Sequence, residues 1–200
     1  MDYQILAERP EDAALIDPLL DRTFGPERMT KTVYRLREML APVSGLSFAA
    51  IDPDGELLGS IRYWPILIEG KPAILLGPLA VEPRLQGKGI GKALVRHSLR
   101  EARRLGHAIA AVVGEPEYYE PFGFRPATAY GLILPGPVDP RRFQAQELAT
   151  GALDGLRGLI ARDERALRDD LTRLRRGPAR TRERHRGRSA GCALRAGLLH

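Results

Sequence analysis

The sequence predicts an α/β protein in which helices flank a mixed sheet. Three apolar segments over residues 46–81 are separated only by the short turns "DPDG" and "EGK", which is typical of an antiparallel meander. Apolar residues at helical spacing follow over residues 89–105, and a short apolar strand comes directly afterwards. We therefore expect strands and helices to combine in one α/β sandwich.

The first forty residues predict one strand and two helices. The segment "YQILAE" of residues 3–8 has the composition of a strand. Pro10 stands near the start of a helix over residues 9–24, and the acidic residues that follow it suit the positive end of the helix dipole. A second helix is expected next, with an apolar face made of Val33, Leu36, Met39 and Leu40.

The rest of the body predicts the meander, one long helix and several shorter elements. Pro53 and Gly55 suit a reversal inside the meander, and Gly106 stands where a left-handed residue would end the long helix. The expected strands cover residues 46–51, 56–68, 72–81, 107–114, 123–134 and 142–148, and a helical turn covers residues 115–122.

Length and charge divide the chain into a body and a tail. Its 200 residues are 44% hydrophobic and 28% charged, which suits one soluble domain with a sizeable core. Residues 161–200 hold 12 of the 31 basic residues but 5 of the 25 acidic ones, so the body is nearly neutral and the tail is basic. We predict a domain over residues 1–158 and an arginine-rich tail over residues 159–200 that is helical in part or disordered.

Composition also disfavours several classes of protein. The longest central apolar run, "AILLGPLAV", is about half of the ~20 residues that a membrane span needs. The first residues lack a basic region followed by an apolar stretch, so we expect a cytoplasmic protein with no membrane partner. Cys192 is the only cysteine, and neither His97 nor His107 has a partner at metal-ligand spacing, so we expect neither an intrachain disulfide nor a metal.

Glycines and lysines crowd residues 84–94, "RLQGKGIGKAL", where a strand is expected to give way to a helix. A glycine-rich turn at a helix N-terminus presents backbone N–H groups that bind phosphate, and Lys88 and Lys92 add positive charge. The alternative is that the glycines serve only a tight turn with close packing of strand on helix. Three glycines exceed what one turn needs, and each costs conformational entropy, so we favour an anion site.

Two common phosphate-binding motifs do not fit this turn. A Walker A loop requires G-x-x-x-x-G-K-[ST], whereas the chain has Gln86 in place of the first glycine and Ala93 in place of the hydroxyl residue. A dinucleotide fingerprint would require glycine where Lys92 stands. Residues 86–91, "QGKGIG", instead match the pattern Q/R-x-x-G-x-G/A.

This pattern resembles the acetyl-CoA signature of the GNAT N-acetyltransferase superfamily. The expected element order and the segment "YYEPFGF" are similar to that superfamily as well, and the resemblance covers about residues 1–150. The segments "TFGPERMTKTVYRLRE", "LLGPLAVEP" and "EPEYYEPFGF" resemble a bacterial subfamily of predicted acetyltransferases of uncharacterised substrate. The resemblance implies a twisted, mostly antiparallel sheet whose central strands splay apart to hold acetyl-CoA.

The resemblance implies acetyl-CoA as a cosubstrate and assigns residues to it. The N–H groups of the glycine turn would hold the pyrophosphate, and the backbone of Leu79 and Val81 would pair with the pantetheine arm as an extra strand. An amide near them would polarise the thioester carbonyl. The implied cofactor-binding residues are Leu79, Ala80, Val81, Gln86, Gly87, Lys88, Gly89, Ile90, Gly91 and Lys92.

The resemblance also implies a catalytic acid. Tyr119 lies four residues before "GF", as in the family pattern Y-x-x-x-G-F, and would protonate the departing thiolate of CoA. Adjacent Tyr118 is expected to pack, and the alternative is that both tyrosines only pack. No general base is assigned, because residues 74–79 hold no carboxylate and Glu69 and Glu82, at the ends of that strand, are expected to be surface charges.

The resulting hypothesis is an N-acetyltransferase that acts by direct attack of a primary amine, from a small molecule or a peptide, on acetyl-CoA. Residues 22–35 could line the acceptor pocket, but their mixed charges do not choose between a polyamine, an aminoglycoside, an amino acid and a protein N-terminus. Two alternatives lack catalysis: a CoA-binding regulator, and an arginine-rich module for nucleic acid or an acidic partner. The tail has no interleaved aromatic residues, so nucleic acid is disfavoured, and a homodimer is left open.

Overall fold

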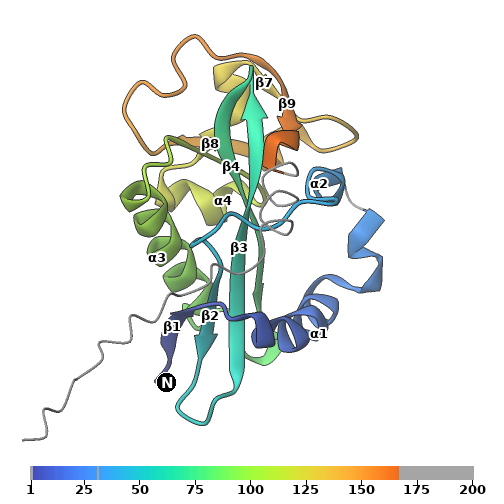
Figure 1. Cartoon of the computed structure of the whole chain (residues 1–200), viewed down its shortest axis with the longest axis vertical. Coiled ribbons are helices and arrows are strands. Elements are labelled where there is room, and N and C mark those ends of the chain that lie inside the picture. Colours follow the sequence, from blue (N-terminus) through green and yellow to red (C-terminus); the bar gives the residue numbers. More distant parts are fainter. Residues whose placement is uncertain (1, 31, 167–200) are drawn as a thin grey trace, which may run out of the picture.

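The computed structural model describes residues 2–30 and 32–166, and one open sheet runs through its centre (Figure 1). The main strand order is β1-β2-β3-β4-β5-β8-β6, and β9 pairs with both β3 and β7. The strands are β1 (Gln4–Ala7), β2 (Phe48–Ile51), β3 (Leu57–Ile68), β4 (Lys71–Val81), β5 (Ile109–Val113), β6 (Arg125–Pro126), β7 (Leu132–Ile133), β8 (Phe143–Glu147) and β9 (Gly158–Arg162). The α-helices are α1 (Ala13–Phe24), α2 (Thr32–Arg35), α3 (Ile90–Arg104) and α4 (Pro116–Tyr119).

The predicted meander and the mixed sheet are confirmed. Strands β1 to β4 pair in sequence order, and each pair is antiparallel. Strand β5 lies parallel to β4, because α3 carries the chain back along the sheet before β5 begins. Strands β5 and β6 both pair with β8 in antiparallel fashion, so antiparallel neighbours predominate.

The parallel pairing of β4 with β5 is short. It joins Ile74, Leu75 and Leu76 to residues 110–112 and then stops. Beyond Leu76, β4 stays paired with β3 as far as Val81, whereas β5 stays paired with β8. The two central strands therefore part toward their C-terminal ends, as the resemblance implied.

The register of β3 and β4 is interrupted just after Leu76, where β4 and β5 part. Leu79 pairs with Ile61 and Leu76 pairs with Tyr63, so Gly77 and Pro78 together stand opposite a single residue of β3. An extra residue of this kind is a β-bulge, which bends the strand that contains it. Gly77 has a φ of +119°, a backbone conformation that favours glycine. The bulge therefore contributes to the parting of β4 from β5.

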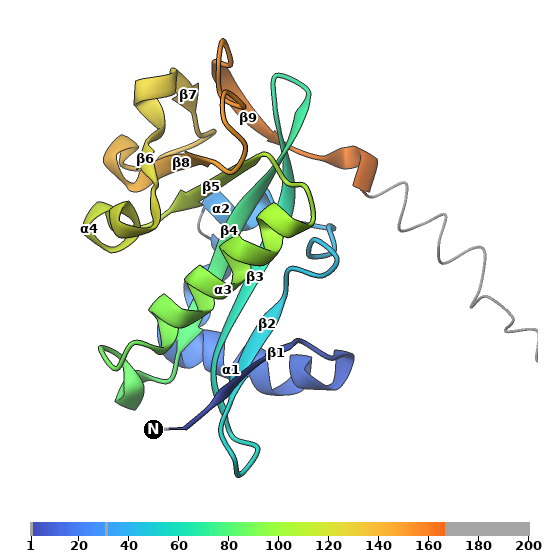
Figure 2. The ribbon, with the colours of Figure 1, turned by 90° about the vertical axis from the view of Figure 1, so that its left-hand side faces the viewer.

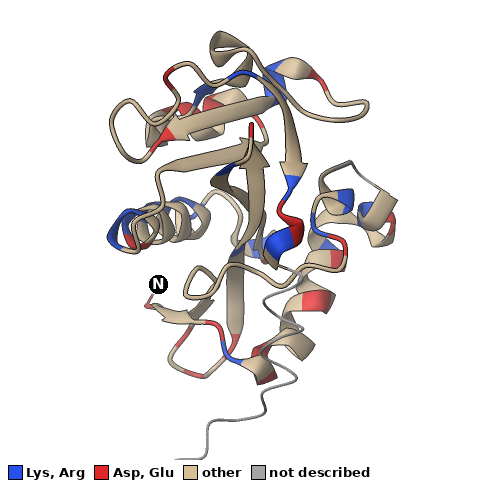
Figure 3. Cartoon of the chain, turned by 45° about the horizontal axis from the view of Figure 1, so that its top comes forward, with Lys and Arg blue, Asp and Glu red and all other residues tan. Residues whose placement is uncertain are grey.

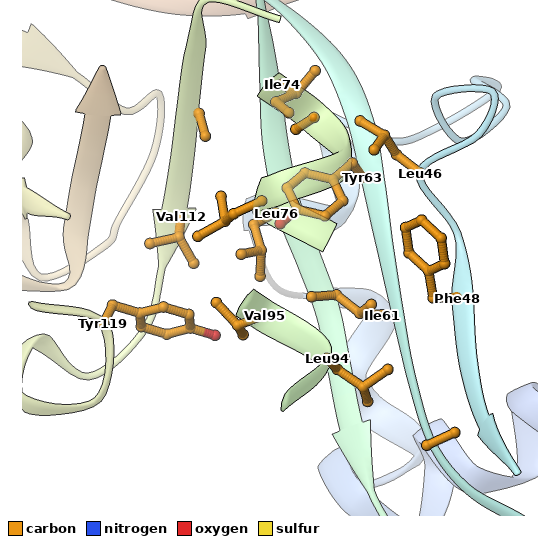
Figure 4. Packing of buried hydrophobic residues seen from close by; sticks show 14 of the residues in the cluster. Leu46, Phe48, Ile61, Tyr63, Ile74, Leu76, Leu94, Val95, Val112 and Tyr119 are labelled. Carbon is orange, nitrogen blue, oxygen red and sulfur yellow. The ribbon is translucent and has the colours of Figure 1, made fainter. Parts of the chain in front are cut away.

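Helices cover both faces of the sheet (Figure 2). On one face, Leu94 of α3 belongs to a buried cluster with Ile61 and Tyr63 of β3 (Figure 4). On the opposite face, Ile16 and Leu19 of α1 are fully buried against β2, β3 and β4. Burial of each such side chain contributes about 1.5–3 kcal/mol, so the two helices are held to the sheet mainly by apolar packing.

The second predicted helix is much shorter than expected. α2 ends at Arg35, and Met39, which was expected on the apolar face, is 81% exposed and has a φ of +63°. Leu36 and Leu40 are buried as predicted. After α2 the chain continues as turns, in which the N–H groups of Arg37 and Leu40 donate to the carbonyls of Tyr34 and Arg37, three residues back.

The segment after α4 also differs from the prediction. Residues 123–134 form two short strands instead of one, because a 3₁₀ turn after Pro126 and a left-handed Gly131 interrupt them. Strand β9, which was not predicted, pairs with β3 and extends the sheet to Arg162, beyond the predicted domain end at residue 158. Of the predicted tail, residues 167–200 lie outside the described residues.

Candidate active site

A cavity of about 830 Å³ opens where β4 and β5 part. One side of it is formed by residues 76–79 of β4, and the opposite side by Val113 and Gly114 at the end of β5. Tyr118 and Tyr119 of α4 complete the wall next to β5. The cavity therefore lies against two strand edges, which is suitable for an extended ligand that pairs with backbone groups.

Part of the predicted acceptor segment also lines this cavity. Phe24, Thr30, Val33 and Tyr34 all belong to residues 22–35 and contribute to its wall. The segment joins the end of α1 to α2, and α1 lies on the face of the sheet opposite α3 (Figure 2). The cavity is thus bounded by elements that lie far apart in the sequence.

The glycine turn lies between the end of β4 and the first turn of α3. Gly87 and Gly89 have φ values of +79° and +90°, which favour glycine, and a Cβ on Gly91 would lie 2.6 Å from the hydroxyl of Tyr118. Turn geometry and close packing therefore account for part of the glycine content, which is what the simpler alternative proposed. Gln86, just before the turn, lines the cavity.

The same turn leaves backbone donors available. The N–H groups in the first turn of an α-helix have no acceptor within the helix. In α3 these N–H groups are those of Ile90, Gly91 and Lys92. Lys88 and Lys92 are exposed beside them, and the solvent-facing side of α3 is basic along its length (Figure 3). This end of the helix can therefore accept an anionic group.

The predicted cofactor-binding residues form two groups, residues 79–81 at the end of β4 and residues 86–92 at the glycine turn and the start of α3. Leu79 lines the cavity, Ala80 is fully buried and pairs with Ser60, and Val81 is half-buried. Ile90 differs from its neighbours because its side chain is buried in the core, so its backbone alone is available. Their assignment to a cofactor remains a prediction.

Tyr119 is buried directly beside the parted strands. Its ring meets Phe124 edge to face, and a Cβ on Gly114 would lie 2.2 Å from the ring, so glycine is required there. Figure 4 shows it in the same apolar cluster as Leu76 and Val95. Burial raises the pKa of Tyr119 above its usual value, so the phenol stays protonated at neutral pH and can donate a proton.

Tyr118 occupies a different position from Tyr119. It is half-buried, its hydroxyl lies over Gly91 in the first turn of α3, and its ring packs near Phe122 at 5.9 Å. The expected packing role is therefore observed. Burial raises the pKa of Tyr118 as well.

Arg37 is a buried residue of this cavity that sequence reasoning missed. Its side chain is 8% exposed, lines the cavity and stacks on Tyr34, with 4.8 Å between the guanidinium carbon and the ring centroid. Burial lowers the pKa of Arg37 to about 10, so it is still a cation at neutral pH. The sequence does not distinguish buried Arg37 from exposed Arg35. Both lie outside the predicted apolar face of the second helix, so both are expected to be exposed to solvent.

The carboxylates considered as bases lie elsewhere. Glu69 is exposed in the turn between β3 and β4, as expected. Glu82 differs from the expectation of a simple surface charge, because its side chain is 13% exposed and forms an ion pair with Arg22 of α1. Neither lines the cavity, so no base is assigned.

Two other carboxylates do line the cavity, and each has a cationic partner. Glu115 lies 3.2 Å from Arg142, and Asp139 lies 2.9 Å from Arg141. Sequence reasoning did not identify them, because acidic residues in exposed loops have no distinguishing pattern.

Two structural observations concern metals and membranes. Within residues 2–30 and 32–166, no three His, Cys, Asp or Glu side chains are grouped as a metal site would require. His97 instead packs on the ring of Phe48 at 4.7 Å, and neither His97 nor His107 lines the cavity. None of the helices in these residues combines the length and the apolar character needed to cross a bilayer.

Comparison with known proteins identifies the family. Residues 14–124 match the model of the "Acetyltransferase (GNAT) family". The chain is 34% identical over 158 residues to the uncharacterised N-acetyltransferase YhbS of Escherichia coli K12, which covers 78% of this chain and 93% of the relative. It is 31% identical over 132 residues to the uncharacterised N-acetyltransferase YjhQ of the same organism, with 64% and 72% covered.

Two solved structures are similar in sequence and fold. The crystal structure of Escherichia coli YhbS in complex with CoA has a TM-score of 0.71 and 32% identity, and covers 81% of this chain and 90% of that one. A GNAT family acetyltransferase from Brucella melitensis in complex with acetyl-CoA has a TM-score of 0.62 and 29% identity, and covers 81% and 96%.

Proposed function

Since this chain belongs to the acetyltransferase (GNAT) family, we propose that it transfers the acetyl group of acetyl-CoA to a primary amine by direct attack. The observation that supports this most strongly is the parting of β4 from β5 beside the glycine turn of α3. CoA binding requires a gap between strands for the thioester arm and a site for the anionic pyrophosphate. The parted strands would provide the first and the glycine turn the second.

The residues around the cavity suit the parts of acetyl-CoA. The unpaired N–H groups at the start of α3 would hold the pyrophosphate, with Lys88 and Lys92 as counterions. The backbone of Leu79 and Val81 would pair with the pantetheine arm. This arrangement would bring the thioester to the part of the cavity between the β4 bulge and Tyr119.

The transfer itself needs few protein groups. The amine nitrogen attacks the thioester carbonyl carbon, the carbon–sulfur bond breaks, and the thiolate takes a proton from the hydroxyl of Tyr119. A backbone N–H near Leu79 would stabilise the negative charge on the carbonyl oxygen during the attack. The amine gives up one proton to solvent as the amide forms, and the phenolate of Tyr119 regains one from solvent, so no protein base is assigned.

Isothermal titration calorimetry tests the ligand. We expect acetyl-CoA to bind, and ATP and NAD to give no heat at the same concentration. Absence of binding by acetyl-CoA would contradict the proposal. Binding without release of thiol for any amine would instead favour the CoA-binding regulator.

A pair of glycine variants tests the turn. Gly89→Val should lose most of the affinity for acetyl-CoA, because a branched side chain would stand where the pyrophosphate approaches the amides. Gly55→Val is the matched control, since Gly55 has a similar φ of +85° and also has open space around it, but lies in the turn between β2 and β3. Both should lose stability to a similar extent, and equal affinity in the two variants would contradict the assigned pyrophosphate site.

A further inference from the structure

Arg37 places a positive charge inside the cavity at the point where the strands part. A Cβ on Gly77 would lie 2.9 Å from Nη2 of Arg37, so the guanidinium lies against the backbone of the β4 bulge. Gly77 follows Leu76, the last residue of β4 that pairs with β5. The cation is therefore held beside the proposed position of the thioester.

The environment of Arg37 does not balance its charge. Its strongest polar neighbours are the hydroxyls of Tyr34 and Tyr119 and the guanidinium of Arg28, and no carboxylate of the described residues forms an ion pair with it. Nε of Arg37 is buried without a hydrogen-bond partner. Arg28 differs, because it forms an ion pair with Asp21 at 2.8 Å. Burial of a cation without an anionic partner is energetically unfavourable.

The remaining charges of the cavity are already matched. Glu115 pairs with Arg142, and Asp139 pairs with Arg141. The other charged side chains of the described cavity wall therefore each have an ion-pair partner, whereas Arg37 has none. An acceptor with several positive charges, such as a polyamine or an aminoglycoside, would be repelled by it.

We propose that Arg37 binds a carboxylate of the acceptor, so that the substrate is a small amine with a carboxylate near its amino group, as in an amino acid. This inference rests on the proposed acetyl transfer. The planar guanidinium can donate two parallel hydrogen bonds to a carboxylate, which restores the missing partner.

The spacing along β4 agrees with this substrate. Leu79, which is proposed to lie beside the thioester carbonyl, comes two residues after Gly77 in the bulged part of β4, so their Cα atoms are at most roughly 6–7 Å apart. A carboxylate held at Arg37 and an amine attached one or two carbon atoms away can bridge that distance. Stacking on Tyr34, and on Trp64 at 6.0 Å, keeps the guanidinium in place.

The first experiment compares matched amines by the release of thiol from acetyl-CoA. Each of a set of L-amino acids is compared with its amide, which has the same shape but no negative charge, and cadaverine and spermidine represent polycations. We expect kcat/KM to favour the acids by about tenfold to a hundredfold. The amides lose the amine proton more readily, so this preference would run against intrinsic reactivity. Equal rates for acids and amides, or a preference for polycations, would overturn the inference.

Variants assign the preference to Arg37. Arg37→Gln should abolish the discrimination between acid and amide, and Arg37→Lys, which keeps the charge but loses the paired donors, should reduce it. Arg35→Gln is the matched control, because Arg35 is exposed two residues away and lies outside the cavity wall. Arg35→Gln should retain the full preference. If Arg37→Gln does not fold, Arg37→Lys and the comparison of acids with amides in the unmodified protein still decide the matter.

A binding measurement separates this inference from the proposed function. Calorimetry with the protein saturated with CoA should detect N-acetylglycine but not N-acetylglycinamide, and Arg37→Gln should remove the difference. If no amine is acetylated but N-acetylglycine binds through Arg37, the carboxylate site stands and the proposed reaction fails. If amines are acetylated without regard to a carboxylate, the reaction stands and the role of Arg37 fails.

Discussion

Tyr119 and Gly114 illustrate how single residues define the site. The ring of Tyr119 occupies the space where any side chain at position 114 would begin, so the glycine and the tyrosine are required together. The consequence is a buried phenol at the edge of the cavity, in surroundings that raise its pKa. A proton donor of this kind remains protonated over the pH range in which amines become nucleophilic.

The first prediction concerns Tyr119→Phe. Removal of the hydroxyl should lower kcat by about a hundredfold and leave the affinity for acetyl-CoA unchanged, because the ring still fills the space beside Gly114. Steady-state kinetics and calorimetry measure the two effects. Tyr130→Phe is the control, since Tyr130 lies outside the cavity wall, and it should keep normal kcat. Normal turnover by Tyr119→Phe would mean that Tyr119 only packs.

At the scale of elements, the features that form the site are the length and irregularity of β4. Residues 74–76 of β4 pair with a strand on each side, whereas residues 79–81 pair only with β3. β3 is therefore the strand that holds the C-terminal end of β4 in the sheet. β3 itself also pairs with β2 and β9. Arg62 of β3 reaches across β2 to Glu8, which follows β1, with nitrogen–oxygen distances of 2.8 and 2.6 Å.

The second prediction concerns this ion pair. Both side chains are nearly buried, with 12% of Glu8 and 13% of Arg62 exposed, so Glu8→Gln should lower the free energy of unfolding by about 1–3 kcal/mol. Urea denaturation measures the change. Glu11→Gln is the control, because the Glu11–Arg9 pair is exposed, and it should change stability by less than about 0.5 kcal/mol. Equal effects of the two variants would show that Glu8 does not hold β1 to β3.

At the scale of the whole molecule, the site brings together elements that are spread over residues 24–142. The residues that line the cavity lie between Phe24 and Arg142, and the glycine turn lies within the same range. β9 follows later in the sequence but belongs to the same sheet, with Ile160 fully buried against it. The domain therefore extends at least through β9.

The third prediction compares two truncations. Removal of residues 167–200 should leave acetyl-CoA affinity and thermal stability nearly unchanged, because the cavity and the sheet lie before them. Removal of residues 158–200 should destabilise the protein by at least about 2 kcal/mol, because it also deletes Ile160 and the β3–β9 pairing. Thermal denaturation and calorimetry provide the measurements. Loss of acetyl-CoA binding in the shorter truncation would show that the arginine-rich segment takes part in binding.

The sequence by itself determined the order of most elements, the position of the glycine turn and the meander. These features depend on local properties: the spacing of apolar residues, the φ values open to glycine, and short turns. Only the tertiary structure decided that α2 stops at Arg35, that β9 joins β3, that β4 and β5 part after Leu76, and that Arg37 lies in the cavity. Each of these features depends on contacts between residues far apart in the chain. Whether a charged side chain is buried, and where the pairing of two strands ends, depends on the elements that pack against them and not on their neighbours in sequence.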